Sequence, residues 1–380
     1  MIQFRTADPK RRQQTATRVA FFIAGFAMSA WAPLVPFARL RLGVDDGVLG
    51  ALLLCLGVGS IVAMPWAGYV ASRFGCRSVI LASASLMGLM LPLLAELDSV
   101  PSFMVALLLF GAGLGALDVT INIQAIIVER ESGRAMMSGF HGLFSVGGIA
   151  GALTVTTLLG VGVSLSVAVL SVVVGMAVLL AVAFPNLLTQ GMRSDGPPFA
   201  WPRGSVMMLG VLCFIAFLSE GAVLDWSALF LTRSGTLKAS QGGLGYAAFS
   251  CAMTYFRLTG DAWVRRFGGR AIVMSGALIA AAGLVLATQV SGWAWALGGF
   301  ALVGVGCANI VPVLFTAAGR QTDMPTSLAV PAITTVGYLG ILAGPAAIGV
   351  LAESVGLASA LVVVAVLLVG VAASGRRLLG

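Results

Sequence analysis

Charged side chains are scarce in this sequence. Asp, Glu, Lys and Arg make up 9% of the 380 residues, whereas soluble domains carry roughly 25%. With so little charge and a mean hydropathy of +1.03, the chain has too little polar surface for several water-facing domains. The composition therefore excludes a soluble globular protein, a disordered chain and a nucleic-acid-binding protein, and predicts a polytopic membrane protein.

Histidine and cysteine are also rare. The chain has one histidine and five cysteines, and their spacing matches neither a zinc site nor a disulfide framework. No pairing of a nucleophile with a base is visible in the sequence either. We therefore expect no metal, no cofactor and no enzymatic activity.

Long apolar runs, in contrast, are abundant. A helix needs about 20 apolar residues to cross a bilayer, and division at charges, prolines and polar turns gives twelve runs of about this length. Barrel strands alternate apolar and polar residues, which these runs do not. The sequence thus predicts an all-α polytopic fold with twelve transmembrane helices. The expected spans are 18–38, 47–71, 77–95, 102–128, 137–160, 164–185, 205–231, 241–264, 270–289, 294–319, 327–351 and 357–374.

The basic residues indicate the orientation. Seventeen of the 22 lysines and arginines fall on one side of the predicted spans, and the cytoplasmic side is the one that carries the excess. The distribution predicts a multi-pass protein of the bacterial inner membrane with both termini in the cytoplasm. The expected cytoplasmic segments at the two ends are residues 1–17 and the tail 375–380.

An internal repeat divides the chain into halves. The Arg-Phe-Gly-x-Arg stretch that begins at Arg73 returns 193 positions later at Arg266, and Gly147 and Gly151 correspond to Gly340 and Gly344 at the same offset. We expect two pseudo-symmetric six-helix bundles, 18–185 and 205–374. A Pro- and Gly-containing cytoplasmic linker, 186–204, joins them.

Two six-helix halves with a Gly-x3-x-Arg-x-Gly-x-Arg loop after the second span resemble the major facilitator superfamily. The stretches Gly115-Ala-Leu-Asp118-Val-Thr-Ile-Asn122 and Phe140-His141-Gly-Leu-Phe-Ser145 are similar to the fucose-permease-like branch, and Ser219-Glu220-Gly-Ala-Val-Leu-Asp225-Trp226 to its YbjJ-type inner-membrane members. The resemblance implies a secondary active transporter that works by alternating access, with proton-coupled symport of a small polar solute such as a monosaccharide.

The same resemblance implies a cytoplasmic gate around the loop motif. Ser72 stands where the usual motif has an acid, and Asp261 or Glu129 is expected to take the place of that acid. The candidate gate residues are Gly68, Arg73, Gly75, Arg77, Glu129, Arg134, Asp261 and Arg266.

Three acids lie inside apolar spans: Asp118, Glu220 and Asp225. An ionised carboxylate at the bilayer centre costs on the order of 2.5–3.5 kcal/mol on insertion scales, so such a group faces a cavity, pairs or is protonated. Asp118 and Glu220 are our candidates for proton coupling. Asp225 follows Glu220 by five residues, about 140° around the helix, so the two acids do not face one neighbour squarely.

The remaining candidates for solute binding are aromatic, imidazole and amide side chains in the spans. A neutral imidazole near an acid suits a proton relay or a hydrogen bond to a solute, but a packed histidine is an equal alternative. Tryptophan rings fit the apolar face of a sugar ring, but they are also common in the packed interior. The set, together with Asp225, is Trp31, Asn122, His141, Trp226, Asn309 and Tyr338.

Arg257 is the one basic residue inside a span, four residues before Asp261. This spacing allows an ion pair along one helix face, and the alternative is an anchor for an anionic substrate. For the whole chain, the alternatives to a sugar symporter are a drug/proton antiporter and a transporter-like sensor. The expected partners are a small solute, protons and the lipid bilayer, without nucleic acid, and we expect a monomer.

Overall fold

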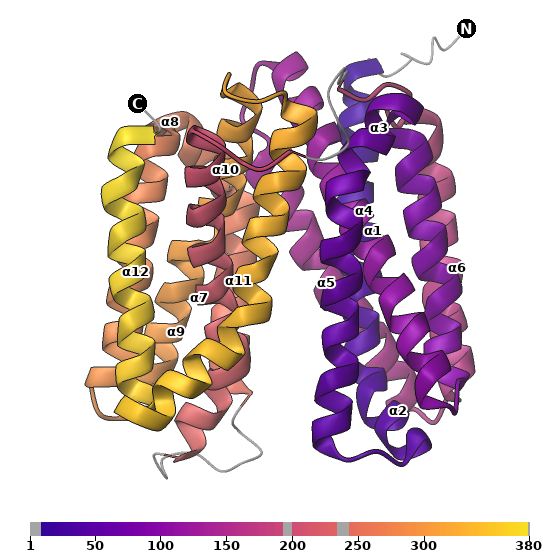
Figure 1. The fold of residues 1–380 in the computed structure, drawn as a ribbon, viewed down its shortest axis with the longest axis horizontal. Helices are drawn as coiled ribbons and strands as arrows, with labels where there is room; N and C mark the ends of the chain where they lie inside the picture. Colours follow the sequence, from indigo (N-terminus) through magenta and orange to yellow (C-terminus); the bar gives the residue numbers. More distant parts are fainter. Residues whose placement is uncertain (1–8, 193–199, 234–242, 379–380) are drawn as a thin grey trace, which may run out of the picture. The chain divides into compact units, whose positions relative to one another are not determined.

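The computed structural model describes residues 9–192, 200–233 and 243–378, which are helical with no strand among them. Figure 1 shows these helices as two bundles that follow one another along the chain. In chain order the elements are α1 (Pro9–Trp31), η1 (Ala32–Leu34), α2 (Val35–Leu42), α3 (Asp46–Glu96), α4 (Val100–Ser132), α5 (Met137–Gly160), α6 (Leu165–Ala183), η2 (Phe184–Asn186), α7 (Ser205–Arg233), α8 (Leu244–Gln289), α9 (Trp293–Cys307), α10 (Ile310–Arg320), α11 (Thr326–Val355) and α12 (Leu357–Leu378).

The chain forms two compact units. Unit 1 contains the described residues of Met1–Arg134, Leu143–Ala200 and Pro325–Pro331. Unit 2 contains the described residues of Ala135–Gly142, Trp201–Met324 and Ala332–Gly380. The first residues of α5 therefore cluster with unit 2, and the first residues of α11 with unit 1.

Ten helical stretches of the described residues are long and apolar enough to cross a membrane. Each of the twelve predicted spans overlaps one of them: α3 and α8 each overlap two spans, and the span 327–351 continues beyond the stretch Thr326–Gly344. Both long helices are bent at one glycine of non-helical conformation, Gly75 with φ +80° and ψ 157° and Gly268 with φ +79° and ψ 152°. These glycines are related by the offset of the sequence repeat, so the repeat is present in the backbone.

Two predicted spans are interrupted in ways that the hydropathy pattern did not indicate. The span 18–38 was expected to be one helix, but α1 ends at Trp31 and a 3-10 turn with Pro33 leads into α2. The span 294–319 is divided at Ala308 and Asn309 between α9 and α10. Proline explains both interruptions, since it lacks the N–H of a helical hydrogen bond.

Close helix packing within each unit depends on small residues. A Cβ added to Gly147 or Gly151 of α5 would overlap the carbonyl groups of Phe22 and Phe26 in α1. In unit 2, a Cβ on Gly340 of α11 would overlap the carbonyl of Phe214 in α7. Helices in lipid gain no hydrophobic energy by associating, so close backbone approach supplies the packing.

Some predictions fall partly outside the described residues. Residues 1–8 of the predicted segment 1–17 and residues 193–199 of the linker 186–204 lie outside the described part. So do residues 241–242 of the span 241–264 and residues 379–380 of the tail 375–380. In the described part, α1 begins at Pro9, nine residues before the predicted first span.

Candidate functional site

Unit 1 has a carboxylate in the middle of α4. Asp118 is half-buried, and the fully buried Asn122 donates from Nδ2 to the Asp118 carbonyl (2.9 Å) and to its Oδ1 (3.4 Å). The two side chains therefore lie on the same face of the helix, as their spacing of four predicts. Glu129 continues this stripe and is also buried, with 7% of its surface exposed.

Trp31 lies at the end of α1 and packs against α4. Its side chain is 5% exposed, and the ring centroid lies 5.8 Å from that of Phe103. This contact is the packing role that the sequence left as the alternative to a solute contact.

Gln124 makes buried hydrogen bonds to two other segments, which the sequence did not predict. Its Nε2 donates to Thr17 Oγ1 in α1 (3.0 Å), and its Oε1 accepts from the backbone N–H of Leu188 (3.1 Å). Gln124 is completely buried and joins α1, α4 and the segment after η2. The one sequence feature that points to this role is an amide side chain inside an apolar run of α4.

The predicted gate residues on α3 contact two different segments of unit 1. A Cβ on Gly68 would overlap the Ser327 carbonyl and come 2.5 Å from Pro331 Cγ at the start of α11. A Cβ on Gly75 would overlap the Thr189 carbonyl. Both glycines therefore permit a close approach of backbones that a larger residue prevents.

Arg77 holds the end of α6 and η2. Its Nη2 donates to the carbonyls of Pro185 (2.7 Å) and Leu187 (2.8 Å), and its guanidinium lies 5.2 Å from the centre of the Phe184 ring. Backbone carbonyls at a helix C-terminus lack helical partners, and a guanidinium satisfies several at once.

The other arginines of the predicted gate are at the surface. Arg73 lies over the Tyr69 ring at 5.0 Å and Arg266 over the Phe267 ring at 5.3 Å. Arg134 is exposed directly after α4, and its N–H donates to Ser132 Oγ (3.1 Å).

Unit 2 contains a buried ion pair between α7 and α8. Arg257 Nη2 donates to Glu220 Oε1 at 3.1 Å, with 8% and 17% of the two side chains exposed. The sequence suggested Asp261 as the partner of Arg257 because the two lie on one helix. The ion pair with Glu220 joins two helices, which spacing along a single helix cannot indicate.

Arg257 also contacts the break between α9 and α10. Pro312 has no N–H to donate to the Ala308 carbonyl, four residues earlier. Arg257 Nε donates to that carbonyl instead, at 3.1 Å. The next residue, Asn309, has a non-helical backbone (φ −113°, ψ 2°) and donates from Nδ2 to the Phe256 carbonyl at 3.1 Å.

Asn309 keeps one polar atom without a partner. The residue is 6% exposed, and its Oδ1 is buried with no hydrogen bond among the described residues. It occupies the N-cap position of α10, where a side-chain oxygen usually accepts a backbone hydrogen bond, but it makes no such bond. A Cβ on Gly260 would overlap Oδ1, so this atom lies against α8 one turn after Arg257.

The remaining predicted ligands of unit 2 are spread over several helices. His141, 9% exposed, lies 5.8 Å from the Phe315 ring and within electrostatic reach of Arg257. Trp226 lies against Gly349 of α11, and its buried Nε1 has no partner in the described part of the chain. Tyr338 meets Phe217 edge to face at 6.4 Å, and Asp225 is exposed.

Asp261 contacts the start of α5. Its Oδ1 accepts from the N–H of Ser138 and its Oδ2 from the N–H of Gly139, both at 3.0 Å. The first N–H groups of a helix have no partner within it, and a carboxylate also interacts favourably with the helix dipole there. Asp261 is thus a side-chain cap on α5.

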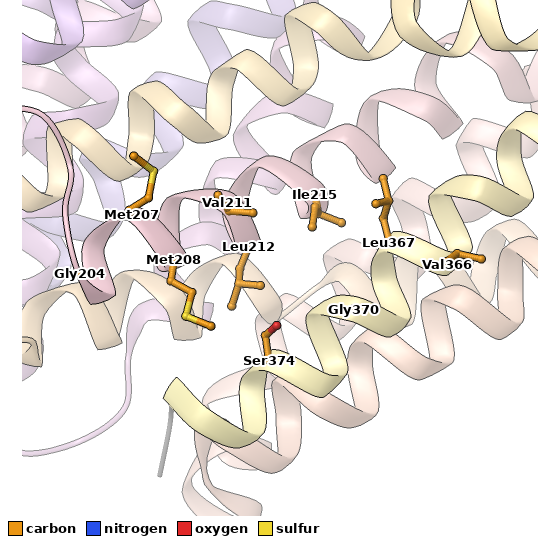
Figure 2. A pocket seen from close by; sticks show the side chains of 10 residues that line it. All are labelled: Gly204, Met207, Met208, Val211, Leu212, Ile215, Val366, Leu367, Gly370 and Ser374. Carbon is orange, nitrogen blue, oxygen red and sulfur yellow. The ribbon is translucent and has the colours of Figure 1, made fainter.

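Figure 2 shows a groove on unit 2 that differs chemically from this cluster. It measures about 460 Å³ and lies between α7 and α12, lined by Met207, Met208, Val211, Val366 and other residues with no charged group among them. A second cavity of about 290 Å³ lies at the ends of α7, α8 and α9. The charged residues described above line neither of them.

The described residues contain no group of three His, Cys, Asp or Glu side chains that is suited to a metal ion. The fold and the buried polar groups define a class: an all-helical, multi-pass membrane protein with carboxylate, guanidinium and amide groups inside apolar helices. Groups of this kind in membrane helices are typical of proteins that move solutes or ions.

Comparison with known proteins identifies the family. The chain is 52% identical to an MFS-type transporter of Yersinia pestis over 376 residues, 99% of this chain and 98% of the relative. The chain therefore belongs to the major facilitator superfamily. No family model matches it.

Two solved structures are similar in fold. The E. coli fucose:proton symporter FucP gives a TM-score of 0.80 at 15% identity, covering 97% of this chain and 99% of that one. The proton:xylose symporter XylE gives a TM-score of 0.78 at 12% identity, covering 98% and 96%. At such low identity the similarity concerns the fold alone.

Proposed function

We propose that the protein is a secondary active transporter that works by alternating access and couples the movement of a small polar solute, such as a monosaccharide, to protons. The observation that carries this proposal is a carboxylate with a polar partner inside the apolar helices of each unit. Asp118 has Asn122 in unit 1, and Glu220 has Arg257 in unit 2. A carboxyl group in such a place changes its charge when it takes up a proton, and this change can govern when the carrier reorients.

The similar folds of FucP and XylE support the proposal, since both are sugar:proton symporters. The basic residues favour the bacterial inner membrane, with both termini in the cytoplasm. Asn122, His141, Trp226 and Asn309 supply both donors and acceptors, which a polyhydroxylated solute requires.

Uptake into proteoliposomes tests the proposal. Vesicles with an imposed inward proton gradient are offered radiolabelled monosaccharides, and accumulation above the outside concentration is measured. Asp118→Asn should abolish accumulation while exchange of solute across the membrane continues. Asp98→Asn, a change at an exposed loop residue, is the matched control and should accumulate like the wild type. Unaltered uphill uptake by Asp118→Asn would remove Asp118 from the mechanism.

The same vesicles distinguish the alternatives. A drug/proton antiporter would expel cationic dyes against a proton gradient and would raise drug resistance when overexpressed. A transporter-like sensor would show no flux of any solute. Either result would contradict the proposal that the protein is a symporter.

A further inference from the structure

We propose that the groove between α7 and α12 binds one phosphatidylethanolamine molecule, with an acyl chain in the groove and the headgroup between Arg203 and Asp323. This lipid site is independent of the proposed transport function. Three features of unit 2 support it: the apolar lining of the groove, its length, and two opposite charges at one of its ends.

The groove lies on the membrane-spanning part of two helices. These stretches are Ser205–Thr232 of α7 and Leu357–Gly375 of α12, and side chains of both helices surround the groove (Figure 2). Its lining includes Met207, Val211 and Val366, which are exposed at the surface of unit 2. The volume of about 460 Å³ falls in the range of small-molecule sites, about 300–1,000 Å³. An apolar chain is the occupant that such a lining accepts.

The groove extends about halfway across a bilayer. Its lining on α7 runs from Gly204, directly before the helix, to Ile215. Eleven residues of helix rise about 16 Å at 1.5 Å per residue, and the hydrocarbon core is about 30 Å thick. Trp201, near the Gly204 end, is 77% exposed, and tryptophan is enriched at the level of the headgroups. The groove therefore matches the depth of one leaflet, as the acyl chain of a phospholipid does.

Two opposite charges lie at the end of the groove where α7 begins. Arg203 directly precedes Gly204 and is exposed. A Cβ on Gly204 would overlap Asp323 Oδ2, so this exposed carboxylate lies against the first residue of the groove. The hydrogen bond from the Ser205 N–H lowers the pKa of Asp323 below its ordinary value of 3.8, so the carboxylate is charged at neutral pH.

A zwitterionic headgroup complements this pair of charges. Lipid chains are as apolar as the side chains of the groove, so the acyl chain provides little selectivity and the headgroup decides which lipid binds. A phosphate accepts hydrogen bonds from a guanidinium, and a primary ammonium donates up to three, which a carboxylate accepts. Phosphatidylethanolamine carries both groups. Phosphatidylcholine has the same charges but no N–H on its ammonium, and phosphatidylglycerol has no positive charge to pair with Asp323.

Lipids that differ in one group test the headgroup. Delipidated, full-length protein in detergent is titrated with the dioleoyl forms of these three lipids, and native mass spectrometry gives the dissociation constant of the first lipid bound. We expect phosphatidylethanolamine to bind about tenfold more tightly than phosphatidylcholine, the ratio that one charge-assisted hydrogen bond supports. Equal affinities for these two lipids, or tighter binding of phosphatidylglycerol, would overturn the assignment.

Two variants separate the contributions of the charges. Asp323→Asn should remove the preference for phosphatidylethanolamine over phosphatidylcholine, because it removes the carboxylate that accepts from the ammonium. Arg203→Gln should weaken the binding of both lipids, because both carry the phosphate. A preference that persists in Asp323→Asn, or unchanged affinities in Arg203→Gln, would contradict the roles given to these residues.

A third variant tests the groove itself. Gly370 lines it on α12, and a Cβ there would meet nothing within 4 Å among the described residues, so Gly370→Leu should fold and fill the space of the acyl chain. Gly298→Leu on α9 is the matched control, because a Cβ at Gly298 is equally free of described neighbours and the residue lines neither cavity. We expect Gly370→Leu to lose the tight site for phosphatidylethanolamine and Gly298→Leu to keep it. Binding to Gly370→Leu with the affinity of the wild type would overturn the groove as the lipid site.

Discussion

Gln124 shows how a single residue holds segments of unit 1 together. It satisfies the Leu188 N–H and bonds to Thr17 Oγ1 in a completely buried position. Replacing one partner of a buried hydrogen bond leaves the other without a partner, at about 1–3 kcal/mol. The residue therefore contributes to stability through the groups that it satisfies.

We predict that Gln124→Met lowers the free energy of unfolding by about 1–3 kcal/mol, because the Leu188 N–H is left buried and unpaired. The midpoint of thermal unfolding in one detergent measures the effect. Gln289→Met, at an exposed position on α8, is the matched control and should change stability by less than about 0.5 kcal/mol. Equal effects of the two substitutions would contradict the structural role of Gln124.

At the scale of single residues, the sequence indicated which polar side chains lie inside the helices, but it indicated their partners less well. Asn122 is bonded to Asp118 as their spacing on one helix predicts. Arg257 pairs with Glu220 of another helix, and Asp261 caps α5. Contacts between helices depend on how those helices pack, and a spacing rule covers contacts within one helix only. The solute and coupling roles of the candidate residues stay predictions.

The two bent helices provide a prediction at the scale of elements. Gly75 and Gly268 share a backbone conformation that is almost restricted to glycine, and alanine there costs on the order of 1–3 kcal/mol. A Cβ at Gly75 would also overlap the Thr189 carbonyl, whereas a Cβ at Gly268 would meet nothing within 4 Å.

Gly75→Ala should therefore destabilise the protein more than Gly268→Ala does, although both should lower the midpoint of thermal unfolding. The second substitution is the matched control, because it tests the backbone conformation without the steric contact. If both variants unfolded at the same temperature, the overlap with the Thr189 carbonyl would make no contribution to the loss of stability.

The start of α7 gives a prediction for the effect of pH. The Ser205 N–H donates to Asp323 Oδ2 at 2.6 Å, and this hydrogen bond lowers the pKa of Asp323 below its ordinary value of 3.8. A lowered pKa in the folded state means that the carboxylate stabilises the fold above pH 3.8, and that this contribution disappears as the pH falls through the lowered pKa.

Asp323→Asn should accordingly unfold at a lower temperature than the wild type at pH 7, and the difference should vanish as the pH is taken well below 3.8. Thermal unfolding followed over this pH range measures it. Asp98→Asn, at an exposed loop acid, serves as the control. A difference that persists at the lowest pH would mean that Asp323 acts through something other than its charge.

At the scale of elements, hydropathy predicts where apolar helices lie, but it does not predict where a helix is interrupted. Each predicted span overlaps an apolar helical stretch, and the span 137–160 coincides with α5. The break at Ala308 was missed because apolar residues continue through it. Pro312 was its visible signal, since its missing N–H leaves the Ala308 carbonyl for Arg257.

At the scale of the whole molecule, the repeat was the most informative feature of the sequence. It relates Gly75 to Gly268, where both long helices bend, and it predicted the fold of the family to which the chain belongs. The repeat is not chemically exact: Gly68, which allows close approach to α11, corresponds to Asp261, which caps α5. A repeat conserves backbone geometry, while each half can use the same position for different chemistry.

Solute-dependent proton movement tests the central claim most directly. Proteoliposomes that contain a pH-sensitive dye receive monosaccharides from outside, and the internal pH is followed. The account predicts acidification with a transported solute, absent from protein-free vesicles and from Asp118→Asn. Solute entry that proceeds without any acidification in wild-type vesicles would contradict proton-coupled symport.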